Sequence, residues 1–365
     1  MTGVYLDYNA SAPVLPAAAE AVAMALRQPG NPSSVHAFGR AARARMEDAR
    51  EAVARLVGAT PAQVVFTSGG TEAAALALHA FRDRPALVSA IEHPCVLEAL
   101  PGAERMPVTA DGVLHLDWLA DRLRRAPAPA VVALMLANNE TGVLQPVAEA
   151  AALARAAGAA VFCDAVQGPG KVVVDITALG VDLLALSAHK LGGPQGVGAV
   201  VARAPEALAP LVAGGGQERG RRGGTQNGPG IAGFGAAARA IAAGECVSCL
   251  NDLRDRLEDG IRRLAPQAAI WGAAARRLPN TTCVGLPGVD QQRALMALDL
   301  AGVAVSAGSA CSSGKVAPSH VLTAMGATPR QAREAIRVSL GWRSTARDVD
   351  AFLDAWGALA RSSAA

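Results

Sequence analysis

The chain has 365 residues, of which 51% are hydrophobic and 18% are charged, and its formal net charge is +3. This composition excludes an intrinsically disordered chain and predicts a large buried core, while the length favours two domains of unequal size. The weak net charge does not support nucleic acid or an anionic membrane as a partner, and no apolar stretch is long enough to span a bilayer.

The cysteines and the N-terminus both favour a cytoplasmic protein. The first residues lack the basic region and the apolar core of a signal peptide. Six cysteines are scattered along the chain, which indicates reduced thiols and no disulfide framework. Cys246 and Cys249 have the spacing of half a metal site, but no second pair matches them, so we expect a helix face and no metal.

Helical and apolar segments alternate up to about residue 240. A helical pattern covers residues 38–57 and is closed by Gly58. Six short apolar runs then predict strands, namely Val64–Phe66, Ala86–Ile91, Ala130–Leu136, Ala159–Cys163, Leu183–Leu186 and Val197–Val201. Strands that alternate with helices predict a parallel, doubly wound sheet and therefore an α/β fold.

The pattern changes near Gly244, where we place a domain boundary. A helix follows, with apolar residues at helical spacing from Val247 to Leu264. It leads into a shorter series of strands and helices that ends in a helix over residues 345–359.

Polar residues follow five of the predicted strands. Ligands of open α/β sheets bind at the carboxyl ends of the strands, so these residues are the candidates for a site. The five segments are Thr67–Glu72, Glu92–His93, Asn138–Glu140, Asp164–Gln167 and Ser187–Lys190. Each has a structural explanation when taken alone, such as a helix cap or a tight turn. Together they exceed what ordinary loop composition supplies.

Three of these segments describe a pyridoxal phosphate site. Thr67–Glu72 is a glycine-rich turn before a helix, which suits a phosphate, and it lacks the lysine or the G-x-G-x-x-G pattern of ATP or NAD sites. Asp164 ends an apolar strand, where a carboxylate needs a cation such as a protonated ring nitrogen, although a helix cap is the alternative. Lys190 is one of only three lysines, with Lys171 and Lys315, and an amine at such a strand end can engage a carbonyl.

Seven motifs occur in order over nearly the whole chain: Tyr5–Ala10, Gly30–Ser34 with His36, Thr67–Glu72, Glu92–Pro94, Asn138–Gly142, Ser187–Lys190 and Ser306–Cys311. They resemble the cysteine desulfurases of the NifS and IscS branch of the class V aminotransferase family. The resemblance implies a homodimer of the fold type I of pyridoxal phosphate-dependent transferases. We expect a large, mainly parallel sheet domain over residues 14–250. Residues 1–13 and 251–365 are expected to form a smaller α/β domain that carries Cys311 and Arg337.

The resemblance also implies a role for each site residue. Lys190 binds the cofactor covalently, Asp164 pairs with its ring nitrogen, and His93 stacks on its ring. Gln167 and Asn139 reach the ring oxygen. The phosphate is held by Gly70, Thr71, Ser187 and His189 and, from the partner subunit, by Thr225. The substrate L-cysteine is bound by Asn31, Asn139 and Arg337.

The implied reaction yields L-alanine and a persulfide on Cys311. Lys190 removes the Cα proton of the substrate, and His93 transfers a proton at its thiol. The sulfur then passes to an acceptor protein, such as a scaffold for iron–sulfur clusters. A free cysteine is most often a small buried hydrophobe, but Cys311 lies among serines and glycines, which favours an exposed nucleophile.

The sequence departs from the family pattern at four positions and leaves two alternative functions open. Ala12, Ala73, Ala74 and Gln195 stand where the family often has other residues. One alternative is another class V enzyme, either a selenocysteine lyase or a small-molecule aminotransferase, and the Cys311 loop argues against transamination. The other is a non-catalytic sulfur carrier, and Lys190 argues against it.

Overall fold

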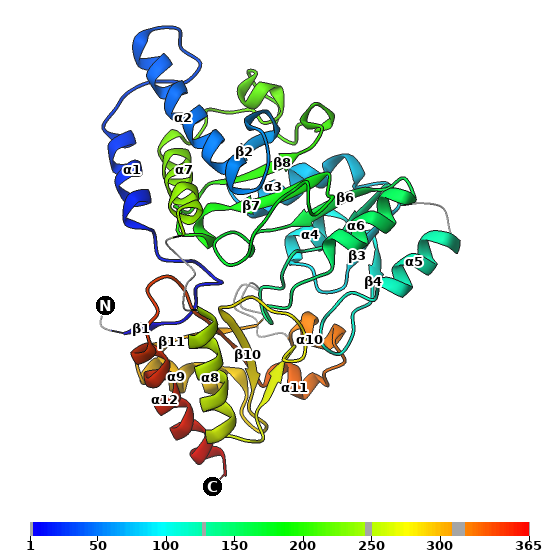
Figure 1. The fold of residues 1–365 in the computed structure, drawn as a ribbon, viewed down its shortest axis with the longest axis vertical. Coiled ribbons are helices and arrows are strands. Elements are labelled where there is room, and N and C mark those ends of the chain that lie inside the picture. The colour runs from blue at the N-terminus through cyan, green and yellow to red at the C-terminus, as the bar shows by residue number, and fades with distance from the viewer. Residues whose placement is uncertain (1–2, 126–128, 245–249, 309–317, 365) are drawn as a thin grey trace.

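The computed structural model describes residues 3–125, 129–244, 250–308 and 318–364, and Figure 1 shows their arrangement. The largest sheet has seven strands in the order β2-β8-β7-β6-β5-β3-β4. The strands are β2 (Val64–Thr67), β3 (Ala86–Ser89), β4 (Glu104–Met106), β5 (Val131–Ala133), β6 (Ala160–Asp164), β7 (Leu183–Ser187) and β8 (Gly198–Ala202). The six predicted strands are confirmed, five with small changes at their ends and Ala130–Leu136 shortened to Val131–Ala133. Strand β4 was missed because it begins with the exposed Glu104 and Arg105.

The sheet is mainly parallel, as predicted, but β8 runs antiparallel to both of its neighbours, β7 and β2. The reason is the short connection from Ser187 to Gly198, since a parallel crossover needs about a dozen residues or more. Two successive antiparallel pairings restore the direction, so β2 points the same way as β7, β6, β5 and β3. The carboxyl ends of these five strands therefore lie at one edge of the sheet.

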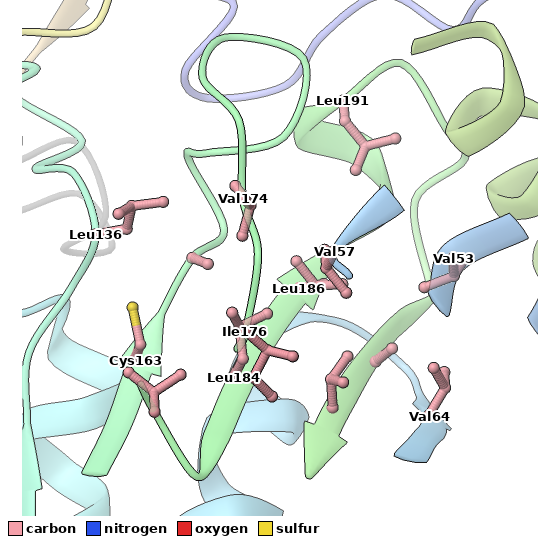
Figure 2. Packing of buried hydrophobic residues seen from close by; sticks show 14 of the residues in the cluster. Val53, Val57, Val64, Leu136, Cys163, Val174, Ile176, Leu184, Leu186 and Leu191 are labelled. Atoms are coloured by element: carbon pink, nitrogen blue, oxygen red, sulfur yellow. The ribbon is translucent and has the colours of Figure 1, made fainter. Parts of the chain in front are cut away.

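Helices cover both faces of this sheet. Along β7, Leu184 and Leu186 belong to one hydrophobic cluster, and Leu183 and Ala185 belong to another on the opposite face. This alternation is the pattern of a strand buried on both sides. Figure 2 shows part of the first cluster, in which Leu184 and Leu186 pack with Ile176. The helices are α1 (Pro16–Leu26), α2 (Ala37–Leu56), α3 (Gly70–Leu78), α4 (Pro94–Ala99), α5 (Leu116–Arg125), α6 (Val147–Ala156) and α7 (Gly228–Ala242).

The C-terminal part of the chain builds a second layer around a four-stranded antiparallel sheet of order β12-β13-β10-β9. Its elements are α8 (Leu250–Leu264), β9 (Ala269–Trp271), β10 (Thr281–Gly285), α9 (Gln291–Leu300), β12 (Ser306–Ala307), α10 (His320–Ala324), α11 (Pro329–Arg333), β13 (Ala335–Ser339) and α12 (Ala346–Ala364). The N-terminal strand β1 (Val4–Tyr5) joins this layer by pairing with β11 (Val303–Ala304), and Leu6 is buried in its core (Figure 1). The division into residues 14–250 and residues 1–13 with 251–365 stays a prediction. Among the described helices, none has the length and apolarity that a bilayer crossing requires.

A buried ion pair anchors the loop between β8 and α7. Arg50 of α2 donates from Nη1 to Glu218 Oε2 at 2.7 Å and from Nη2 to Oε1 at 3.0 Å, and the Phe66 amide donates to the same carboxylate at 2.9 Å. Glu218 and the following Arg219 have positive φ angles of 47° and 58°, a region that costs energy for residues other than glycine. The pair therefore stabilises a strained turn near Thr225.

We expect Arg50→Met to lower the free energy of unfolding by about 3–5 kcal/mol, because it leaves the Glu218 carboxylate buried without its cation. Urea unfolding followed by circular dichroism measures the change. The control is Arg55→Met, which removes the exposed pair with Glu51 on the same helix and should cost only about 0.5 kcal/mol. Equal effects of the two variants would contradict a structural role for the buried pair.

Candidate active site

A cavity of about 330 Å³ lies at the carboxyl edge of the large sheet. Each of the five predicted strand ends contributes to its wall: Gly70 and Thr71 after β2, His93 after β3, Asn139 after β5, Asp164 and Gln167 from β6, and Ser187, His189 and Lys190 after β7. Arg337 of β13 closes it from the smaller sheet. Ten residues that were proposed from the sequence are thus brought together around one space.

Asp164 places a carboxyl group at the bottom of a low-dielectric site. It is only 8% exposed, and its Oδ1 accepts a hydrogen bond from the Val166 amide at 2.9 Å. Burial raises the pKa of this carboxyl, although the amide, His93 and Lys190 act in the opposite direction. A cationic partner inside the cavity would therefore stabilise the ionised form.

The turn after β2 has the features of an anion site. Helix α3 begins at Gly70 with no side-chain cap, so its first amides are available to a ligand. Ser187, on the facing strand, is buried, and within the described residues its Oγ has no hydrogen-bond partner. Glu72 receives the Ser68 amide at 2.7 Å and the Arg222 guanidinium at 2.7 Å, which fixes the turn from behind.

His93 is held in one tautomer. Its Nδ1 accepts the Cys95 amide at 3.2 Å and lies 3.0 Å from the Cys95 thiol, so the proton of the neutral ring is on Nε2. Burial lowers the pKa of His93, with Asp164 opposing this effect. The ring is consequently a neutral surface with one N–H donor.

Lys190 lies in a short helical turn after β7, where its Nζ donates to the carbonyl oxygens of Asn9 at 2.6 Å and Ala10 at 2.9 Å. The N-terminal segment therefore reaches the cavity and orients the amine. Asn9 and Ala10 were quoted in a motif but given no role, because nothing local in the sequence connects them with β7. Their position follows from the pairing of β1 with β11.

Arg337 supplies a buried guanidinium. It pairs with Asp7 at 2.6 Å and donates to the Asn139 carbonyl at 3.2 Å, while its Nε has no partner within the described residues. The side chain is 3% exposed and lines the cavity. One donor of the guanidinium is thus left for an anionic group in the cavity.

Two predicted residues are not at this cavity. Asn31 is exposed, and its Oδ1 accepts the Ser33 amide at 2.9 Å. Thr225 lines a separate cavity of about 90 Å³ with Thr67 and Arg222. Their roles in binding substrate and the partner's phosphate stay predictions.

Cys311 lies outside the described residues, as do Cys246, Cys249 and Lys315. The residues on either side of residues 309–317 both contact Glu140, which follows Asn139 of the cavity wall. Ser319 Oγ donates to Glu140 Oε2 at 2.6 Å, and Gly308 packs so closely on this carboxyl group that a Cβ would clash with it. Gly308 and Ser319, which flank the segment that contains Cys311, therefore both lie beside Glu140.

His189 gives the site a testable pH dependence. Burial, with Lys190 nearby, lowers its pKa to about 4 from an ordinary value of about 6.5. Between these values the unfolded chain binds more protons than the folded chain, so the contribution of His189 to stability rises with pH. We expect the stability difference between wild type and His189→Asn to increase from pH 4 to 6.5 and to stay level above. A difference that is constant with pH in ligand-free protein would contradict the shift.

The chain is similar over nearly its whole length to one protein family, to named relatives and to solved structures. A family model described as "Aminotransferase class-V" matches residues 4–352. A cysteine desulfurase from Cereibacter sphaeroides is 44% identical, covering 97% of this chain and 95% of its own length. An IscS-like cysteine desulfurase from Mycobacterium tuberculosis is 39% identical, with 98% and 96% covered. The crystal structure of a NifS-like protein from Rickettsia africae superposes with a TM-score of 0.89 at 33% identity, over 98% of this chain and 99% of the other.

Proposed function

The chain belongs to the class V aminotransferase family, and on this premise we propose that it is a cysteine desulfurase that converts L-cysteine to L-alanine. The observation that carries the proposal is the convergence of Lys190, Asp164 and an anion-binding turn on one cavity. Relatives that bear the name cysteine desulfurase match nearly the whole chain, so the likeness includes both sheets.

The residues present fit pyridoxal phosphate. The buried Ser187 hydroxyl, which has no partner in the described part of the chain, and the uncapped start of α3 offer donors to a phosphate at one end of the cavity. Gly70 suits this crowded place, since a Cβ there would lie 3.0 Å from Val166 Cγ2 and 3.4 Å from Ser187 Cβ. At the other end, the buried Asp164 carboxyl needs a cation, which a protonated pyridine nitrogen provides.

We therefore assign the holding of the cofactor to these side chains. Lys190 would bind it covalently, Asp164 would pair with its ring nitrogen, and the neutral His93 ring would stack on its ring. Gln167 and Asn139 serve its ring oxygen. Its phosphate is held by Gly70, Thr71, Ser187 and His189. When bound, pyridoxal phosphate supplies a sink for the electron pair released at the substrate Cα.

The chain's own groups carry out the remaining steps. Arg337 binds the substrate carboxylate through its guanidinium, which Asp7 holds in place. Lys190 takes the Cα proton, because its Nζ is oriented beside the cavity by two carbonyls. His93 transfers a proton at the substrate thiol.

Sulfur transfer is assigned to Cys311. Its thiolate attacks the substrate sulfur, a sulfur–sulfur bond forms, and the bond from sulfur to Cβ breaks. The electron pair of that bond goes to Cβ, which takes up a proton and becomes a methyl group. Lys190 returns a proton to Cα, and the product is alanine. The persulfide on Cys311 then passes its outer sulfur to a thiol of an acceptor protein, such as an iron–sulfur scaffold. The active form is a cytoplasmic homodimer in which Thr225 reaches the phosphate of the partner subunit.

The test is the product balance of purified protein with L-cysteine, pyridoxal phosphate and a thiol reductant, without any keto acid. A desulfurase yields alanine and sulfide in equal amounts. Transamination would require a keto acid and would give no sulfide, so alanine that appears only with added keto acid would favour an aminotransferase. A protein that binds no cofactor and forms no alanine would favour the sulfur carrier.

A further inference from the structure

We propose that Lys171 is a positioning residue, which fixes the side-chain amide of Gln167 in the orientation that presents an N–H to the cofactor. Lys171 does not line the described cavity, whereas Gln167 does. Lys171 therefore acts through Gln167 and not by touching cofactor or substrate. Because its effect is exerted on a bound cofactor, the proposal rests on the function proposed above.

A tight turn returns Lys171 to Gln167. The amides of Lys171 and Val172 both donate to the Gly168 carbonyl at 3.0 Å. Gly170 has a φ of +79°, in the left-handed region that favours glycine. As a result, Lys171 Nζ lies 2.5 Å from Gln167 Oε1, although four positions separate the residues in the sequence.

The two neighbours of the Gln167 side-chain amide settle which of its atoms is the oxygen and which is the nitrogen. The Asn9 backbone carbonyl only accepts hydrogen bonds, so the Gln167 atom that faces it must be the nitrogen. The atom that faces Lys171 Nζ is then the oxygen, to which the amine donates. The Gln167 nitrogen then points the other way, where it donates one hydrogen to the Asn9 carbonyl at 3.0 Å. The second hydrogen on this nitrogen is available to an acceptor in the cavity. It is the donor that a cofactor oxygen needs.

The same amine also orders Asn9. Lys171 Nζ donates to Asn9 Oδ1 at 3.1 Å, and Asn280 donates to the same oxygen at 3.1 Å. The Asn9 side chain is thereby fixed, and the Asn9 carbonyl accepts from both Gln167 and Lys190. One half-buried lysine thus connects the amide at the cofactor ring with the amine that binds the cofactor.

The position is costly for a residue that only fills space. Burial lowers the pKa of Lys171 well below its ordinary range, and the neighbouring cations Lys190 and Arg337 lower it further. A methionine has a similar shape and no such cost. An amine at this place is explained by the two oxygens that it holds.

A double-mutant cycle tests the inference, with Lys171→Met, Gln167→Leu and the double variant in the full-length protein. Titration with pyridoxal phosphate gives the dissociation constant, and the pH titration of the bound cofactor's absorbance reports on its ring oxygen. We expect Lys171→Met to weaken binding roughly ten-fold and to shift the absorbance titration. In the Gln167→Leu background the same substitution should have a much smaller effect on both quantities, because only the contact with Asn9 is then lost. Lys171→Arg, which is also only a donor, should restore part of both.

Arg276→Met is the matched control. Arg276 is an exposed cation that lines, together with Lys171, a second cavity of about 440 Å³. The Arg276 variant should leave both the dissociation constant and the absorbance titration unchanged. If Lys171→Met does not fold, Lys171→Gln replaces it, since glutamine lets the Gln167 amide turn over. The inference is overturned if Lys171→Met or Lys171→Gln binds pyridoxal phosphate as tightly as the wild type. It is also overturned if Lys171→Met weakens binding equally in the wild-type and the Gln167→Leu backgrounds. A wild-type protein that binds no pyridoxal phosphate overturns the proposed function instead.

Discussion

Replacement of Cys311 by alanine is expected to lower alanine production from L-cysteine by orders of magnitude while the protein keeps its fold and its bound cofactor. The cavity residues Lys190, Asp164 and Arg337 are unchanged in this variant, so cofactor and substrate should still bind. A covalent nucleophile has no substitute, and its loss therefore appears in kcat and not in KM. Steady-state kinetics with alanine detection, together with the cofactor spectrum, measures both expectations.

Cys95 provides the matched control, because it is the described cysteine that lines the cavity. Its amide and thiol both approach His93, so Cys95→Ala should cause a modest loss through the histidine. The assignment is wrong if the Cys95 variant loses turnover and the Cys311 variant retains it. Equal modest losses in both, with pyruvate and sulfide appearing as products, would indicate an elimination without a protein nucleophile.

Lys190→Ala is expected to abolish covalent cofactor binding and to reduce turnover by about 10²- to 10⁴-fold or more, because one side chain supplies both the covalent attachment and the general base. Borohydride reduction of the wild type followed by peptide mapping should place the pyridoxyl group on Lys190. Alanine assays with and without an added small amine show whether the missing base can be replaced in part.

Lys190→Arg is the companion variant, since arginine keeps the positive charge but neither forms the covalent bond nor gives up its proton. It should be as inactive as Lys190→Ala. Near-normal turnover in either variant contradicts the site, as does a pyridoxyl group on Lys171 or Lys315.

The features predictable from sequence were those with a local signature. An apolar run followed by a polar residue marks a strand end, and so Thr71, His93, Asp164 and Lys190 could be placed at one edge before any coordinates. The direction of β8 was missed, because it depends on the length of a connection and not on composition.

Contacts between segments far apart in the chain could not be predicted. Asn9 and Asp7 reach the site because a two-residue strand pairs with β11, and no pattern in the sequence specifies that pairing. Lys171 was identified only as a possible covalent amine, since its contact with Gln167 depends on the turn at Gly170. Burial and charge at such places are set by the tertiary structure.

Direct detection of the transferred sulfur tests the central claim most closely. Wild-type protein is incubated with one equivalent of L-cysteine in the absence of reductant, alkylated, digested and analysed by mass spectrometry. Sulfur transfer through the protein predicts one additional sulfur atom on the peptide that contains Cys311, together with an equal amount of alanine. Additional sulfur on the Cys95 peptide, or alanine formed while Cys311 remains unmodified, would contradict it.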